Sequence, residues 1–138
     1  MEAPQDCETV TLAESIVFVG QRAFDLGPAL YQCLESRSRV TRSLSELDRG
    51  WAIRNCTLLL LNELVQLNAL AHGESAVHDV SRYVALEPIL LIGDEVVDSE
   101  FFFDSLVLVV SASLGEAFND QLHLDWRLLI DARLFATR

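Results

Sequence analysis

Histidine side chains are the first candidates for acid–base chemistry or metal binding in this sequence, and there are three of them. His72, His78 and His123 lie far apart in the chain, and none is next to a second likely metal ligand. His78 precedes Asp79, a pairing in which a carboxylate can orient a general base. A surface or helix-capping role explains such a pair more simply, so the histidines predict neither a catalytic base nor a metal site.

The cysteines give no stronger indication of chemistry. Cys7, Cys33 and Cys56 have no metal-binding spacing, and their odd number makes no disulfide framework, which fits a reducing compartment. Cys56 lies in an apolar segment and Cys33 shares a predicted helix face with Ala29, so we expect both to be packing residues. The sequence contains no glycine-rich phosphate loop after a predicted strand and no nucleophile elbow, and its carboxylates are scattered. We therefore expect no enzyme activity, no metal and no cofactor.

Length and charge narrow the class of protein further. The 138 residues suit a single domain, 1–138, in which residues 1–8 are expected to form a flexible N-terminus. Hydrophobic residues make up 51% of the chain, enough for a core, whereas the net charge is −11 and all ten basic residues are arginines. Nucleic acids and anionic membranes attract basic surfaces, so neither is an expected partner. The acidic start is unlike a signal peptide, which predicts a cytoplasmic protein.

The elements that carry these residues are predicted to be helices. Only three prolines and six glycines interrupt the chain, and apolar residues recur every three or four positions. Pro28 is typical of a first helical position, Ser43 with Glu46 reads as a capping box, and Asp98 or Ser99 suits the start of a later helix. The expected helices cover residues 9–24, 28–37, 44–71, 98–118 and 126–134.

The segment 77–97 is compatible with either strand or helix. Gly93 and Asp94 suit a hairpin turn, although we prefer a turn or kink between two central helices. Residues 101–118 are apolar around most of the helix circumference, so we expect them to form the most buried helix. The predicted fold class is all-α, a compact bundle of six to eight helices.

Four short motifs occur in an informative order. Residues 29–47 begin with Ala-Leu and end with Leu-Ser-Glu-Leu, and residues 61–64 read Leu-Asn-Glu-Leu. Residues 79–86 read Asp-Val-Ser-Arg-Tyr-Val-Ala-Leu, and residues 118–122 read Phe-Asn-Asp-Gln-Leu ahead of Trp126. Their order resembles that of the Bcl-2 family of apoptosis regulators. The tryptophan and glycine of the family's first homology motif are replaced here, and the Gly-Trp of its second motif is absent.

This resemblance implies a bundle around a central apolar helical hairpin, with a groove that binds the amphipathic death-motif helix of pro-apoptotic partners. It implies an inhibitor of apoptosis, and the divergent motifs are typical of virus-encoded members. Arg82 would pair with the partner's aspartate. Asp79 and Ser81 stand where the family has Asn and Gly, and would make the groove selective. The groove assignment, for which core packing is the alternative role, is Val40, Leu44, Leu47, Leu60, Leu64, Arg82, Val84 and Ala85.

Location and two other functions stay open at this point. The chain stops without the apolar tail that anchors many family members, so we expect recruitment to mitochondria only through partners. A homodimer is compatible with the sequence. The other functions are a pro-apoptotic pore-forming member of the same fold and an unrelated acidic helical adaptor, such as a secretion chaperone or an immunity protein. Residues 89–96 also resemble a death motif, but Pro88 would interrupt that ligand helix.

Overall fold

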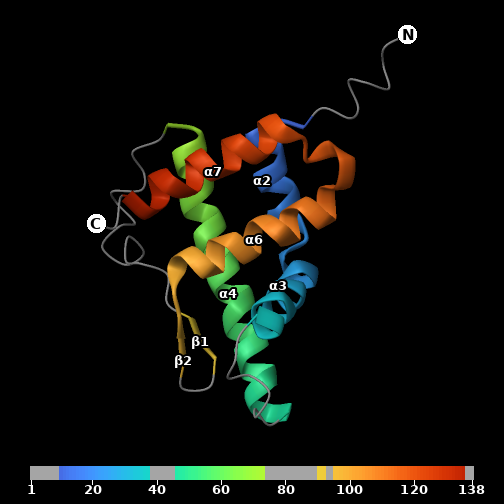
Figure 1. Cartoon of the computed structure of the whole chain (residues 1–138), viewed down its shortest axis with the longest axis vertical. Coiled ribbons are helices and arrows are strands. Elements are labelled where there is room, and N and C mark those ends of the chain that lie inside the picture. Colours follow the sequence, from blue (N-terminus) through green and yellow to red (C-terminus); the bar gives the residue numbers. More distant parts are fainter. Residues whose placement is uncertain (1–9, 38–45, 74–89, 93–94, 136–138) are drawn as a thin grey trace.

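The computed structural model describes residues 10–37, 46–73, 90–92 and 95–135, and this part of the chain is predominantly helical (Figure 1). The prediction of a helical fold is therefore confirmed. The helices are α2 (Leu12–Gln21), α3 (Ala23–Arg37), α4 (Glu46–Ala71), α6 (Ser99–Leu114) and α7 (Asp120–Phe135), with a short 3-10 turn η2 (Gly115–Ala117). Two short strands, β1 (Leu90–Ile92) and β2 (Glu95–Val97), pair as an antiparallel hairpin.

Helix α4, with 26 residues, is the longest element and the scaffold for the others. Helices α2, α3 and α7 each pack against it, while α6 packs against α3 and α7. In Figure 1, α6 and α7 cross in front of α4, and the β hairpin leads into the start of α6. Strand β1 also contacts α4. This arrangement buries one side of α4 under the rest of the bundle.

The core lies between these helices and consists mainly of leucine and aromatic side chains. Helix α6 contributes the largest buried share, with eight of its 16 residues buried. Its Phe102 and Phe103 rings meet edge to face at 5.4 Å. Trp126 of α7 is fully buried, and its indole Nε1 donates a 2.9 Å hydrogen bond to Ser15 Oγ of α2. That bond satisfies the one polar atom of a large core side chain and attaches α7 to α2.

The junction between α2 and α3 differs from the prediction. We expected the first helix to reach residue 24 and the next to start at Pro28, but the break is at Arg22 and Pro28 lies inside α3. Proline in a helix interior removes one backbone donor, and the helix continues through it here. The start of α2 carries a full capping box, because Thr11 Oγ1 accepts from Glu14 N at 3.1 Å and Thr11 N donates to Glu14 Oε1 at 3.0 Å.

Several other predicted boundaries are confirmed or shifted. Asp98 caps α6 as expected, since its Oδ1 accepts from Glu100 N at 2.8 Å. Helix α6 stops at Leu114 rather than at residue 118, where Gly115 adopts a positive φ of 61°. Helix α7 begins six residues earlier than predicted, because Asn119 Oδ1 accepts from Leu122 N at 2.9 Å and caps it. Helix α4 ends at Ala71, as predicted.

The hairpin resolves the ambiguity of the segment 77–97 in favour of strands where the structure describes it. Ile92 pairs with Glu95, so the two residues between them connect strands. The preferred interpretation of Gly93 and Asp94 as a turn or kink between two helices is therefore wrong. Those two residues, and the predicted capping residue Ser43, lie outside the described residues.

Candidate binding site on helix α4

The structure describes three of the residues that the sequence assigned to a ligand groove: Leu47, Leu60 and Leu64, all on α4. Leu47 is 72% exposed, whereas Leu60 is 0% and Leu64 5% exposed. Val40, Leu44, Val84 and Ala85, together with Arg82 and the selectivity residues Asp79 and Ser81, lie outside the described residues.

The assignment of Leu60 and Leu64 to a groove wall is corrected by their burial. Both side chains belong to the core, which is the alternative role that the sequence left open. The physical reason is helix periodicity. At 100° per residue, Leu60 lies roughly 220° around α4 from Leu47, so the two cannot line one groove on a single helix.

A hollow of about 280 Å³ lies on the outer side of the first turns of α4. The described residues that line it are spaced so that they share one side of the helix: Glu46, Leu47, Gly50, Trp51 and Arg54. Trp51 is 53% exposed, which is high for so large an apolar side chain. We call these five residues the α4 pocket.

The α4 pocket is a small, mainly apolar site that also carries one cation, Arg54, and one carboxylate, Glu46. Leu47 and Trp51 are four residues apart, so their side chains are neighbours on the helix surface. Gly50 lies beside them, and a Cβ built at Gly50 would meet nothing within 4 Å, which leaves open space at this point. The Arg54 guanidinium lies 5.5 Å from the centre of the Trp51 ring, a cation–π contact. Among the residues that the structure describes, Arg54 forms no ion pair.

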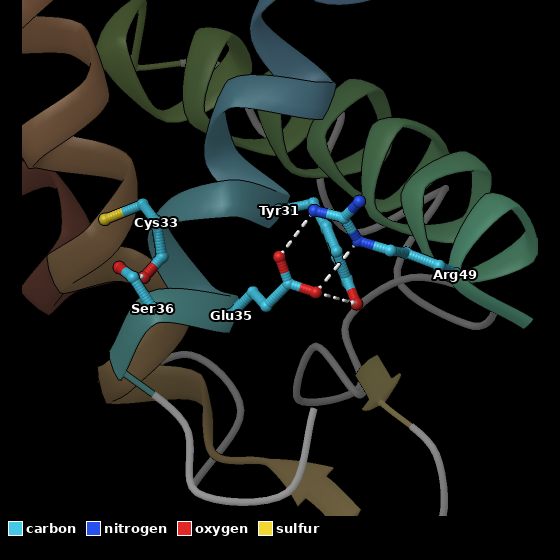
Figure 2. Close-up of polar contacts among 5 residues, drawn as sticks. All are labelled: Tyr31, Cys33, Glu35, Ser36 and Arg49. Atoms are coloured by element: carbon cyan, nitrogen blue, oxygen red, sulfur yellow. Dashed lines mark hydrogen bonds and ion pairs between the residues drawn. The ribbon is translucent and has the colours of Figure 1, made fainter. Parts of the chain in front are cut away.

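A polar cluster holds the start of α4 against α3 (Figure 2). Arg49 of α4 makes a two-pronged contact with Glu35 of α3, with Nε to Oε2 at 2.9 Å and Nη2 to Oε1 at 2.6 Å. The Tyr31 hydroxyl donates to Glu35 Oε2 at 3.4 Å. Burial, followed by the charge of Glu35, raises the pKa of Tyr31, so this phenol stays protonated. The cluster therefore joins the helix turns that carry the α4 pocket to α3.

Deeper along α4, a fully buried ion pair joins it to α7. Arg133 donates from Nε to Glu63 Oε1 at 2.7 Å and from Nη2 to Glu63 Oε2 at 3.0 Å. The two side chains are 2% and 1% exposed. Burial raises the pKa of Glu63, and Arg133 partly offsets that rise. This pair is closed to solvent, so it positions α4 and α7 rather than contacting a ligand.

The cysteine and histidine side chains that the structure describes do not form a reactive site. Cys56 is fully buried, as expected, and burial raises the pKa of its thiol to about 12. His72, the residue after α4, has its Nδ1 2.8 Å from the Asn68 carbonyl oxygen of that helix. The ring centres of His123 and Phe118 are 5.5 Å apart. Within the described ranges, no three His, Cys, Asp or Glu side chains are grouped closely enough to hold a metal ion.

A second hollow, of about 130 Å³, lies between α6 and α7 and differs from the α4 pocket in its chemistry. An ion pair between Arg127 and Asp104, at 2.6 Å, borders it. Both side chains are more than 40% exposed, so this pair is a surface contact of small energetic value. We therefore take the apolar α4 pocket as the candidate binding site.

Sequence reasoning missed Gly50, Trp51 and Arg54, which complete the site around Leu47. The signal was present in the sequence, because the apolar residues of α4 fall on both of its faces. An amphipathic helix needs only one apolar face to reach the core. The second set of apolar positions was therefore available for another contact.

We compared the chain with known proteins in three ways. Neither protein-family models, nor curated proteins, nor solved structures gave a match to the chain. Of the helices that the structure describes, none is long and apolar enough to cross a membrane. Function must therefore be inferred from the α4 pocket and from the motifs in the sequence.

Proposed function

We propose that this protein inhibits apoptosis by sequestering the amphipathic death-motif helix of pro-apoptotic partners, and that the helix docks at the α4 pocket. The observation that carries the proposal is the exposure of Leu47 and Trp51 beside the open space at Gly50. An amphipathic helix presents apolar side chains at spacings of three and four residues. Two apolar neighbours with a gap beside them suit one such side chain.

The four ordered motifs support the same function. They imply a Bcl-2-like bundle around a central helical hairpin, a viral origin, and a cytoplasmic protein that reaches mitochondria through its partners. They also assign Arg82 as the partner of the ligand's aspartate. Replacing it should weaken binding by about 1–3 kcal/mol, the range for a hydrogen bond to a charged group.

The test is direct binding of a panel of labelled death-motif peptides to the full chain, followed by fluorescence anisotropy. Leu47→Glu should weaken binding at least about tenfold, since it places a charge where an apolar anchor must dock. The matched control is Leu128→Glu on α7, which changes a similarly exposed leucine away from the α4 pocket and should have no effect.

Three results would contradict the proposal. They are no binding of any death-motif peptide at micromolar concentration, equal losses for Leu47→Glu and Leu128→Glu, and activated dye release from liposomes by the chain alone. The last of these is expected of a pore-forming member. The same peptide panel tests the predicted selectivity. If Asp79 repels the ligand's own aspartate, Asp79→Asn should broaden the set of peptides bound.

A further inference from the structure

The outer face of α4 carries apolar side chains well beyond the α4 pocket. They follow a spacing that alternates between four and three residues, and we call this row, which also contains one cation, the α4 seam: Leu47, Trp51, Arg54, Leu58, Leu61 and Val65. Leu61 is the partly buried member of the row, because it also packs against the core. Leu58 is 51% and Val65 58% exposed, although both are aliphatic. At 1.5 Å per residue the seam is about 27 Å long.

An alternating four–three spacing is the pattern by which one helix packs along another. It repeats every 3.5 residues on average, which keeps one row of side chains facing a partner helix. The opposite side of α4 already supplies the core, through Cys56, Leu60 and Leu67 among others. The seam is therefore a second apolar face, and exposed apolar rows of this length mark interaction surfaces.

The charge on the seam determines which helix fits. Arg54 is the only charged residue of the seam, and within the described part of the chain it has no carboxylate partner. A second copy of this chain would bring the same six side chains, none of them a carboxylate. Such a pairing would bury two guanidinium groups without a counter-charge, which is costly. A foreign helix with an acidic residue opposite Arg54 meets the requirement.

We infer that the α4 seam binds one long amphipathic helix of a different protein, in the manner of a coiled coil, with an Asp or Glu of that helix paired to Arg54. This inference rests on the proposed function in one respect, because both place a helix on Leu47 and Trp51. It adds that the contact continues through Leu58 and Val65 over at least five turns. Because the net charge of the chain is −11, a helix with a net positive charge, carried away from the seam contact, is favoured as the partner.

The probe for this inference is a labelled synthetic helix of about 24 residues, with leucines at alternating four–three spacing, one central aspartate in that row and lysines on the outer face. A matched probe has asparagine in place of the aspartate. Anisotropy with the full chain should show the aspartate probe binding at least about tenfold more tightly. Arg54→Ala should abolish that difference.

Variants of the chain test the length of the contact. Leu58→Glu and Val65→Glu should each lower the affinity for the aspartate probe at least about tenfold. Leu108→Glu on α6 is the control, since Leu108 is 53% exposed and lies off α4, and its effect should stay within about twofold. Circular dichroism melting of each variant shows that the fold is retained.

The outcomes separate this inference from the proposed function. If Leu47→Glu weakens peptide binding while Leu58→Glu and Val65→Glu do not, the seam is wrong and the α4 pocket alone is the site. If the seam probe binds as expected but no death-motif peptide binds, the seam stands and the proposed function is wrong. If sedimentation shows a dimer that Leu58→Glu converts to a monomer, the occupant is a second copy and the inference is overturned.

Discussion

The buried pair between Glu63 and Arg133 offers the sharpest test of how α4 is held in place. Glu63→Gln keeps the shape of the side chain but removes its charge. The Arg133 guanidinium, 2% exposed, would then lack the carboxylate that it contacts at 2.7 Å and 3.0 Å. Breaking a buried pair in this way costs about 3–5 kcal/mol. Because a domain of this kind is stable by only about 5–15 kcal/mol, the variant should lose much of its cooperative stability.

Removing the other partner should give a pH-dependent result. Arg133→Met removes the hydrogen bond and the positive charge that lower the pKa of Glu63. Burial still raises that pKa above its ordinary value of 4.5. Between the unfolded and folded pKa values, the folded protein then binds more protons than the unfolded chain. Stability is therefore fully present below the unfolded pKa and is lost as the pH rises through the folded pKa. Arg133→Met should be less destabilised at pH 5 than at pH 8.

The assay is urea unfolding followed by circular dichroism at those two pH values, with Glu63→Leu added as a single variant and Glu63→Leu/Arg133→Met as the double variant. Replacing both charges with apolar side chains removes the desolvation penalty, so the double variant should be more stable than either single variant. A cost below about 1 kcal/mol for Glu63→Gln would refute the reasoning, because it would mean that the pair is open to water. A double variant as unstable as the single variants would assign the loss to packing instead of charge.

Two backbone substitutions and one hydrogen-bond deletion test the packing around α4. Gly27→Ala should destabilise by about 1–3 kcal/mol in urea unfolding, because its Cβ would lie 1.9 Å from Thr57 Oγ1 and 3.0 Å from the Thr57 Cα, too close for both to stay in place. Gly50→Ala, with nothing within 4 Å of the new Cβ, should instead raise the stability of the helix by about 0.5–1 kcal/mol. Ser15→Ala should lower the free energy of unfolding by about 1–3 kcal/mol, since the buried Trp126 Nε1 loses its acceptor. An unchanged melting temperature would show that this hydrogen bond contributes nothing to stability.

The helical fold was predictable because its signals are local. Asp98 caps α6 by bonding two residues ahead, and Gly73, just past the end of α4, adopts a positive φ of 65°. The break between α2 and α3 was not predictable in the same way. Pro28 marks a helix start in isolation, yet α3 tolerates it in its second turn because tertiary packing against α4 outweighs the loss of one backbone bond.

The candidate site was only partly predictable, because it depends on which face of α4 meets the core. Leu47 and Leu60 are equally apolar in the sequence, and only the packing of α2, α3 and α7 against α4 decides that one is exposed and the other buried. A helix with apolar residues on both faces gives no single periodic signal from which to choose. The buried pair of Glu63 and Arg133 depends on a contact across 70 positions, which local patterns do not encode.

The two faces of α4 make different demands on its rigidity. A partner helix gains affinity from a surface that is already ordered, since less conformational entropy is then lost on binding. Two ion pairs hold α4 against its neighbouring helices, and they differ in how well they are shielded from water. Near the α4 pocket, Arg49 and Glu35 are 48% and 21% exposed, a contact that water weakens, whereas Glu63 and Arg133 farther along are shielded. We therefore expect the far half of the α4 seam, around Leu58 and Val65, to be the more rigid half, so that a long helix reaching it loses less conformational entropy on binding than one confined to the α4 pocket.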